Sequence, residues 1–76
     1  MTDAATTPHM IPVKSTNVES IGHDQASNTL HIRFKDGAHY SYEGVSAAIH
    51  RELLAADSIG AFVHGQIKGK FKHRKH

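Results

Sequence analysis

Two short stretches of strictly alternating apolar and polar residues, separated by three residues, constrain the fold of this chain most strongly. Residues 29–34 place Leu30, Ile32 and Phe34 on one side, and residues 38–43 alternate in the same way. Alternation with a period of two is typical of a β-strand that buries one face. The sequence therefore predicts a β-hairpin near its centre.

The residues between the two stretches decide how the strands pair. A two-residue turn at Asp36 and Gly37 would set each strand's apolar side against the other's polar side. A three-residue loop over residues 35–37, with Gly37 in a left-handed conformation, matches the two apolar sides instead. We therefore expect the pairs Phe34–Ala38, Ile32–Tyr40 and Leu30–Tyr42 on one face, and the pairs Arg33–His39 and His31–Ser41 on the other.

The remaining patterns complete an α+β fold. Residues 17–23 form a plausible first strand, and the turn-forming residues 24–28 end it. Residues 46–56 are rich in helix-forming types, with Ser46 as the N-cap and with Val45, Ile49, Leu53 and Ala56 toward the sheet. Ser58 caps a second short helix whose apolar positions are Ile59, Phe62 and Val63. The prediction is a three-stranded antiparallel meander with one main helix packed on one face and a second short helix after it.

The chain of 76 residues is long enough for one domain only. We expect a disordered leader over residues 1–10, a domain over 11–71 and a basic tail over 72–76, extended or mobile. Cysteine is absent, so neither a disulfide nor a thiolate ligand is available. No apolar run approaches the roughly 20 residues of a membrane span, and the first residues do not resemble a signal peptide. A cytoplasmic protein without a membrane partner is the expectation.

The charge is divided unevenly along the chain. Residues 1–60 hold four lysines and arginines against seven acidic residues, whereas residues 61–76 hold five basic residues and no acidic one. An acidic body with a basic end indicates a polyanionic partner, such as nucleic acid. The alternative is a solvated tail that only aids solubility.

The ordered set of residues from Val13 to Phe71 resembles the KTSC domain, a short bacterial domain also found at the C-terminus of some lysyl-tRNA synthetases. The resemblance rests on the Ser15–Asp24 segment and on the Leu30-x-Ile32-x-Phe34 strand. It continues through Gly37, the central Tyr40-Ser41-Tyr42 motif, Val45, and the series Leu53-Leu54-x-Ala56-x-Ser58-x-Gly60-x-Phe62, and it ends with Ile67-Lys68-Gly69-Lys70.

The chain departs from the pattern expected of that family at four places. His23 stands where an aromatic residue is common, and Ser46 where a proline often follows the valine. His64-Gly65 stands where an asparagine is common, and Phe71 replaces a tyrosine. Roles that need a hydroxyl group at positions 23 or 71 are thereby in question, but the fold is not. The association with a synthetase that handles tRNA implies RNA as a partner.

The Tyr40 and Tyr42 motif allows two interpretations. Aromatic side chains on a sheet can stack nucleic-acid bases. The expected register, however, puts both rings under the helix, where they belong to the core and their hydroxyl groups reach its rim. We favour the core interpretation.

Eight histidines among 76 residues are unusual, and His31, Arg33 and His39 share the uncovered sheet face in the expected register. Paired histidines can act as general acid and base on a phosphodiester or can bind a metal. The sequence offers no His-x₃-His pair on a helix and no compact set of acidic ligands, so we assign no metal, cofactor or catalytic residue.

The basic end is the main functional candidate. In an extended chain, Lys68, Lys70, Lys72 and Arg74 lie on one side and can follow a phosphate backbone, while Phe71 either stacks a base or anchors the tail. The predicted nucleic-acid-binding residues are Lys68, Lys70, Phe71, Lys72, Arg74, Lys75, Arg33, His31 and His39. A non-catalytic RNA-binding module is favoured; a protein-interaction module and a small phosphodiester hydrolase are the alternatives. The sequence does not set the oligomeric state.

Overall fold

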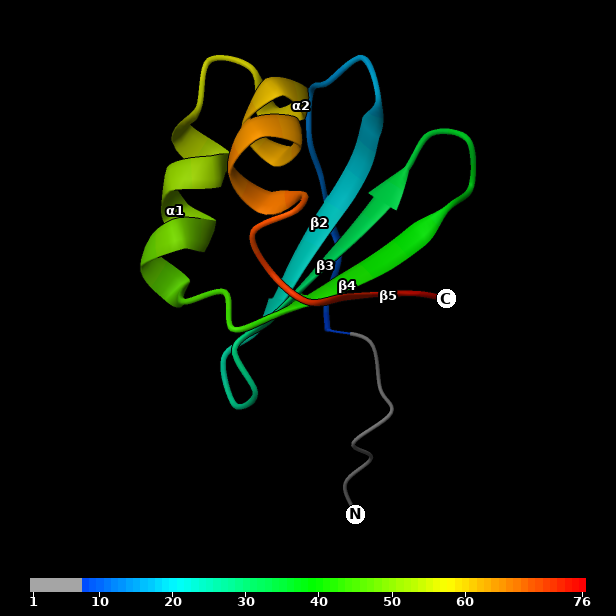
Figure 1. The fold of residues 1–76 in the computed structure, drawn as a ribbon. Coiled ribbons are helices and arrows are strands. Elements are labelled where there is room, and N and C mark those ends of the chain that lie inside the picture. Colours follow the sequence, from blue (N-terminus) through cyan, green and yellow to red (C-terminus); the bar gives the residue numbers. More distant parts are fainter. Residues whose placement is uncertain (1–7) are drawn as a thin grey trace.

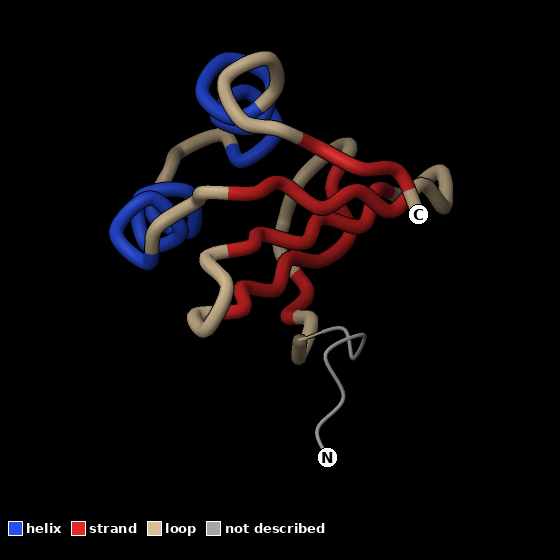
Figure 2. Tube along the Cα trace, turned by 60° about the horizontal axis from the view of Figure 1, so that its bottom comes forward, coloured by secondary structure: helices blue, strands red, loops and turns tan. Residues whose placement is uncertain are grey.

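A computed structural model describes residues 8–76 and shows an α+β fold with five strands in one antiparallel sheet. The strands are β1 (Ile11–Pro12), β2 (Val18–Asp24), β3 (Thr29–Phe34), β4 (His39–Glu43) and β5 (His73–Lys75), and their spatial order follows the chain order. The helices α1 (Ala47–Ala55), α2 (Ile59–Phe62) and the π-helix η1 (Val63–Ile67) lie between β4 and β5. They gather on one side of the sheet (Figures 1 and 2).

The central hairpin has the predicted register. Leu30 pairs with Tyr42, Ile32 with Tyr40, and Arg33 with His39. The backbone N–H of Phe34 donates to the carbonyl of Ala38, which closes the three-residue loop. Gly37 has a φ of 97° there, a conformation that residues with a Cβ rarely adopt. Matching of the apolar faces was therefore sufficient to predict this part of the sheet.

The sequence predicted three strands, and the sheet contains two more, β1 and β5. β1 has only two residues and pairs with β2, so it carries no alternating pattern of its own. β5 lies in the basic segment and pairs with the free edge of β4, with Tyr42 opposite His73 and Tyr40 opposite Lys75. A strand that joins an existing edge is held by backbone hydrogen bonds, which polar residues make as well as apolar ones.

Three residues of the basic tail expected over residues 72–76 are extended, one of the two conformations expected for it, and they belong to the sheet as β5. Of the disordered leader expected over residues 1–10, the first seven residues lie outside the described part of the chain. The described residues Pro8 to Met10 run beside Gly22 of β2, where an added Cβ would stand 2.7 Å from the sulfur of Met10.

Helix α1 begins and ends close to the predicted bounds. The hydroxyl group of Ser46 accepts a hydrogen bond from the backbone N–H of Ile49 at 3.3 Å and caps the first turn. Ser58 caps α2 in the same way through the N–H of Ala61. The chain then widens into η1, where the N–H of Lys68 donates to the carbonyl of Val63, five residues earlier. Within residues 8–76, no helix is long and apolar enough to cross a membrane.

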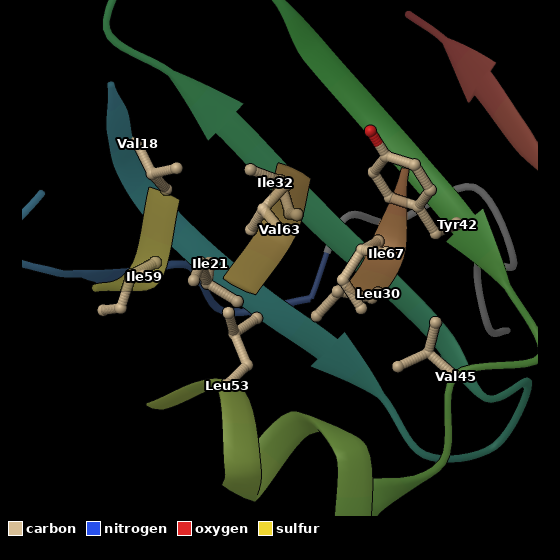
Figure 3. Close-up of a cluster of buried hydrophobic side chains, with 10 residues drawn as sticks. All are labelled: Val18, Ile21, Leu30, Ile32, Tyr42, Val45, Leu53, Ile59, Val63 and Ile67. Carbon is tan, nitrogen blue, oxygen red and sulfur yellow. The ribbon is translucent and has the colours of Figure 1, made fainter. Parts of the chain in front are cut away.

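The core lies between the sheet and the helices (Figure 3). Each strand of the central meander contributes to it, and so do all three helical segments. Its buried members are Val18, Ile21, Leu30, Ile32, Tyr42, Val45, Leu53, Ile59, Val63 and Ile67. This packing covers one face of the sheet and leaves the other face, which we call the outer face, free of helices.

Candidate nucleic-acid interface

The basic segment is divided between the two faces of the sheet. Because side chains alternate along β5, Lys75 lies on the same face as its partner Tyr40, the face that carries the helices, and Arg74 lies on the outer face with its partner Ser41. The sequence predicted that Lys68, Lys70, Lys72 and Arg74 lie on one side. In the structure Lys68 lines a groove on the helix side of the sheet, whereas pairing with β4 turns Arg74 to the outer face.

An open groove of about 600 Å³ lies on the helix side of the sheet, where the β3–β4 hairpin extends past the helices. Its walls combine aromatic rings with three lysines and one carboxylate. We call it the lysine groove, and it is lined by Thr16, Asn17, Phe34, Lys35, Asp36, Ala38, Tyr40, Lys68 and Lys75.

Two lysines of the groove lie against its aromatic rings. The Nζ atom of Lys68 is 5.2 Å from the centre of the Phe34 ring, and that of Lys75 is 6.0 Å from the centre of the Tyr40 ring. Both distances are within the range of a cation–π contact. The two rings meet edge to face with centres 5.8 Å apart. Positive charges and flat apolar surfaces therefore adjoin one another in this groove.

The aromatic surface continues along β4 toward β5. The rings of Tyr40 and Tyr42 are stacked with centres 6.4 Å apart, and the ring of His73 lies about 6 Å from both. A smaller pocket of about 250 Å³ includes these three residues with Lys68 and Gly69. Tyr42 is 2% exposed and belongs to the core, as expected, whereas Tyr40 is half-buried against the core and also lines the lysine groove. Burial, followed by the proximity of Tyr40, raises the pKa of Tyr42.

The other predicted residues of the basic segment lie outside the lysine groove. Lys70 and Lys72 are exposed in the connection that leads to β5. Phe71 is half-buried, packs against the core and approaches the position of a Cβ on Gly44 to 3.9 Å. Phe71 thus fits the anchoring alternative. Phe34 and Lys35 line the groove but were not among the predicted nucleic-acid-binding residues; the signal that could have found them was their place next to the loop of the predicted hairpin.

The outer face gathers three histidines from neighbouring strands. His31 of β3 has its Nδ1 atom 3.1 Å from Nε2 of His39 on β4, and the ring centres of His39 and His76 are 4.8 Å apart. The N–H of His76 donates to the carbonyl of His39, which continues the pairing of β5 by one residue. Ser41 is 7% exposed, and its Oγ lies 2.8 Å from Nε2 of His76. We call His31, His39 and His76 the histidine cluster.

The environment of His31 and His39 disfavours their protonation. Burial, followed by the proximity of His76, lowers the pKa of His31 and of His39. His31 and His39 share this face with Arg33, as predicted, but His76 was missed because its position depends on β5. One nitrogen from each of the three rings lies within 4.8 Å of the others, a spacing from which a metal ion could be bound. The sequence-based assignment of no metal site did not foresee this grouping.

Two other histidines have a role in packing beside α1. The Nε2 atom of His23 lies 2.6 Å from the carbonyl oxygen of Val45, and its ring stacks on that of His50 with centres 5.0 Å apart. Burial, followed by the proximity of His23 and Arg51, lowers the pKa of His50. Position 23, where a hydroxyl-bearing ring was expected, is thus occupied by a side chain that ties the end of β2 to the start of α1.

Comparison with known proteins supports the resemblance seen in the sequence. The model of the KTSC domain family matches residues 14–71. A protein from Tsukamurella paurometabola is 43% identical over 63 residues, which cover 83% of this chain and 94% of that protein. A lysine–tRNA ligase from Trichormus variabilis is 33% identical over 58 residues, which cover 76% of this chain and only 10% of the ligase.

A solved structure has the same fold. The crystal structure of a KTSC domain protein from Yersinia pestis superposes with a TM-score of 0.84 at 40% sequence identity, covering 90% of this chain and 96% of that one. The family match and the shared fold agree over nearly all of the described residues. The chain therefore belongs to the KTSC domain family.

Proposed function

We propose that the chain is a small, non-catalytic module that binds single-stranded RNA in the lysine groove. The observation that carries the proposal is the placement of Lys68 over Phe34 and of Lys75 over Tyr40. A single strand presents phosphates and unstacked bases side by side, and proteins bind it with basic groups next to aromatic surfaces. The groove offers both within one open depression of about 600 Å³.

The charges of the groove favour an anion. The groove is lined by three positively charged side chains and by one carboxylate; these residues are Lys35, Lys68, Lys75 and Asp36. Contacts between lysines and phosphates hold the backbone of a nucleic acid and carry no direct information about base sequence. The proposal therefore assigns weak, salt-dependent binding with little sequence preference. The relationship to a lysine–tRNA ligase makes tRNA, with its single-stranded loops and end, a suitable second probe beside an unstructured single strand.

The proposal assigns no chemical step to the bound RNA. The pair most suited to acid–base chemistry, His31 and His39, lies on the outer face, opposite the groove. A phosphodiester held by Lys68 and Lys75 would therefore lie across the sheet from both imidazoles. This separation favours binding over the alternative of a phosphodiester hydrolase.

The test compares two double variants with the same net charge. Lys68→Gln/Lys75→Gln removes two charges from the groove, and Lys70→Gln/Lys72→Gln removes two from the exposed connection outside it. Binding of an unstructured single-stranded RNA, with tRNA for comparison, is followed by fluorescence anisotropy at about 50 and 200 mM salt. With three phosphate contacts, the wild-type affinity should fall about 20-fold between these salts, because the logarithmic slope for single strands is about −0.7 per contact.

The groove variant should bind weakly and lose only about 3-fold over the same salt range, as expected for one remaining contact. The control variant should behave like the wild type. Equal losses in the two variants would show that charge alone, and not the groove, determines binding. Absence of binding at low salt would refute the RNA proposal, and capture of a protein partner that survives high salt would favour the interaction-module alternative.

A further inference from the structure

We propose that the histidine cluster on the outer face is a binding site for a divalent transition-metal ion, with Zn²⁺ as the reference ion. The three side chains come from three adjacent strands that lie about 4.8 Å apart. His31 and His76 flank β4 from its two sides, and His39 lies on β4 between them. One nitrogen of each ring lies within 4.8 Å of the other two.

The distances between the ring nitrogens of the cluster are close to those between the ligand nitrogens of a zinc site. Zinc–nitrogen bonds of about 2.0–2.1 Å in a tetrahedral site place two ligand nitrogens about 3.3 Å apart. Nδ1 of His31 and Nε2 of His39 are already 3.1 Å apart. The ring of His76 must approach by about 1–2 Å, which a small rotation of an exposed side chain can supply.

The two facing nitrogens of His31 and His39 can both become metal ligands without a change in the charge of either ring. One of the two facing nitrogens carries a hydrogen and the other accepts it. When a metal binds both, that hydrogen moves to the second nitrogen of its own ring, and both imidazoles stay neutral. Imidazole is a good ligand for Zn²⁺, Cu²⁺ and Ni²⁺, and three such ligands leave a fourth position for water or another donor.

Neighbouring residues hold the rings in place. Ser41, which is almost fully buried, contacts Nε2 of His76 at 2.8 Å and so restricts the orientation of that ring. Gly22 lies opposite His31 on β2 and leaves space that the segment from Pro8 to Met10 fills. The segment from Pro8 to Met10 thus borders the cluster on the side of His31, and the cluster is open to solvent at His76.

The charges nearby set the strength of binding. Arg33 lies opposite His39 on the same face, and Arg74 lies opposite Ser41. Both guanidinium groups repel a divalent cation and weaken its binding, whereas the carboxylate of Asp24, which acts on His31, attracts it. Substitution Arg33→Gln should therefore tighten metal binding.

The direct test measures Zn²⁺ binding to metal-free, untagged protein by competition with a fluorescent zinc indicator. We expect one Zn²⁺ per chain in the wild type. His39→Gln or His76→Gln should weaken binding by about 100-fold or more, because loss of an outer-shell partner of a ligand already costs 10–100-fold. His64→Gln is the matched control, since His64 is exposed in η1 and is not part of the cluster. It should bind Zn²⁺ like the wild type.

A second measurement uses the wild-type protein and avoids any effect of substitution on folding. The imidazole NMR signals of His31, His39 and His76 should shift together on addition of one equivalent of Zn²⁺, while that of His64 stays in place. Absence of binding, an equal loss in His64→Gln and His76→Gln, or shifts confined to other histidines would each overturn the proposal. Without added metal, His76→Gln should leave RNA binding in the lysine groove unchanged, which separates this test from that of the proposed function.

Discussion

The substitution of Leu53 by alanine tests how the helix layer is attached to the sheet. Leu53 is the one buried residue of α1, and its side chain is fully enclosed in the core between β2 and α2 (Figure 3). Shortening leucine to alanine removes about three buried carbon groups, worth about 2.4 kcal/mol in transfer free energy. The cavity left behind raises the loss to about 3–5 kcal/mol.

The neighbouring residue supplies a matched control. Leu54 is 39% exposed, so Leu54→Ala removes the same atoms from a position where solvent can fill the space. Its cost should be about 1 kcal/mol or less. A chain of this size has a total stability of about 4–11 kcal/mol. Leu53→Ala should therefore remove a large share of it, and Leu54→Ala only a small one.

Urea denaturation followed by circular dichroism measures both variants. With a slope of about 1 kcal/mol per molar urea for a small domain, Leu53→Ala should lower the midpoint by about 3 M or leave the chain unfolded without urea. Leu54→Ala should lower it by about 1 M or less. Equal shifts in the two variants would refute the assignment of Leu53 to the core and of Leu54 to the surface.

Three further predictions concern local geometry and protonation, and each is measured by the urea midpoint. Gly37→Ala should cost about 1–2 kcal/mol, because φ is 97° in this loop; a neutral effect would contradict the left-handed loop. Ser46→Ala should cost about 1 kcal/mol through loss of the cap on α1, and no loss would show that the cap is not formed. Burial lowers the pKa of His31, His39 and His50 in the folded chain, so the unfolded chain takes up these protons first. Metal-free protein should therefore keep its full stability above about pH 6.5 and lose part of it as the pH falls toward the folded-state pKa values; a midpoint that rises on acidification would contradict this.

Local patterns were sufficient for the centre of the fold. Alternation in residues 29–34 and 38–43, with Gly37 between them, determined the register of β3 and β4. Ser46 and Ser58 marked the starts of both helices. These signals depend on neighbours in the sequence, which is why they could be recognised without the structure. The family resemblance, carried by residues across the whole domain, was also confirmed.

The missed features depend on contacts between distant residues. β5 has a basic sequence with no apolar side, and only the free edge of β4 makes it a strand. The lysine groove and the histidine cluster both require that pairing, so neither could be derived from the basic segment alone. The change from α-helical to π-helical hydrogen bonding at η1 likewise depends on the packing of both Val63 and Ile67 in the core.

The position of β5 has a consequence for how the two candidate sites relate to each other. It is an exposed edge strand of three residues, and its pairing with β4 closes a chain segment of about thirty residues that contains all the helices. Short edge elements of this kind open more readily than the centre of a domain. Lys75 belongs to the lysine groove on one face of the sheet, and the adjacent His76 belongs to the histidine cluster on the other face. Separation of β5 from β4 would therefore disrupt both sites at once. Occupancy of either site would hold this strand closed and so preserve the other, a form of thermodynamic coupling across the sheet that needs no direct contact between the two ligands.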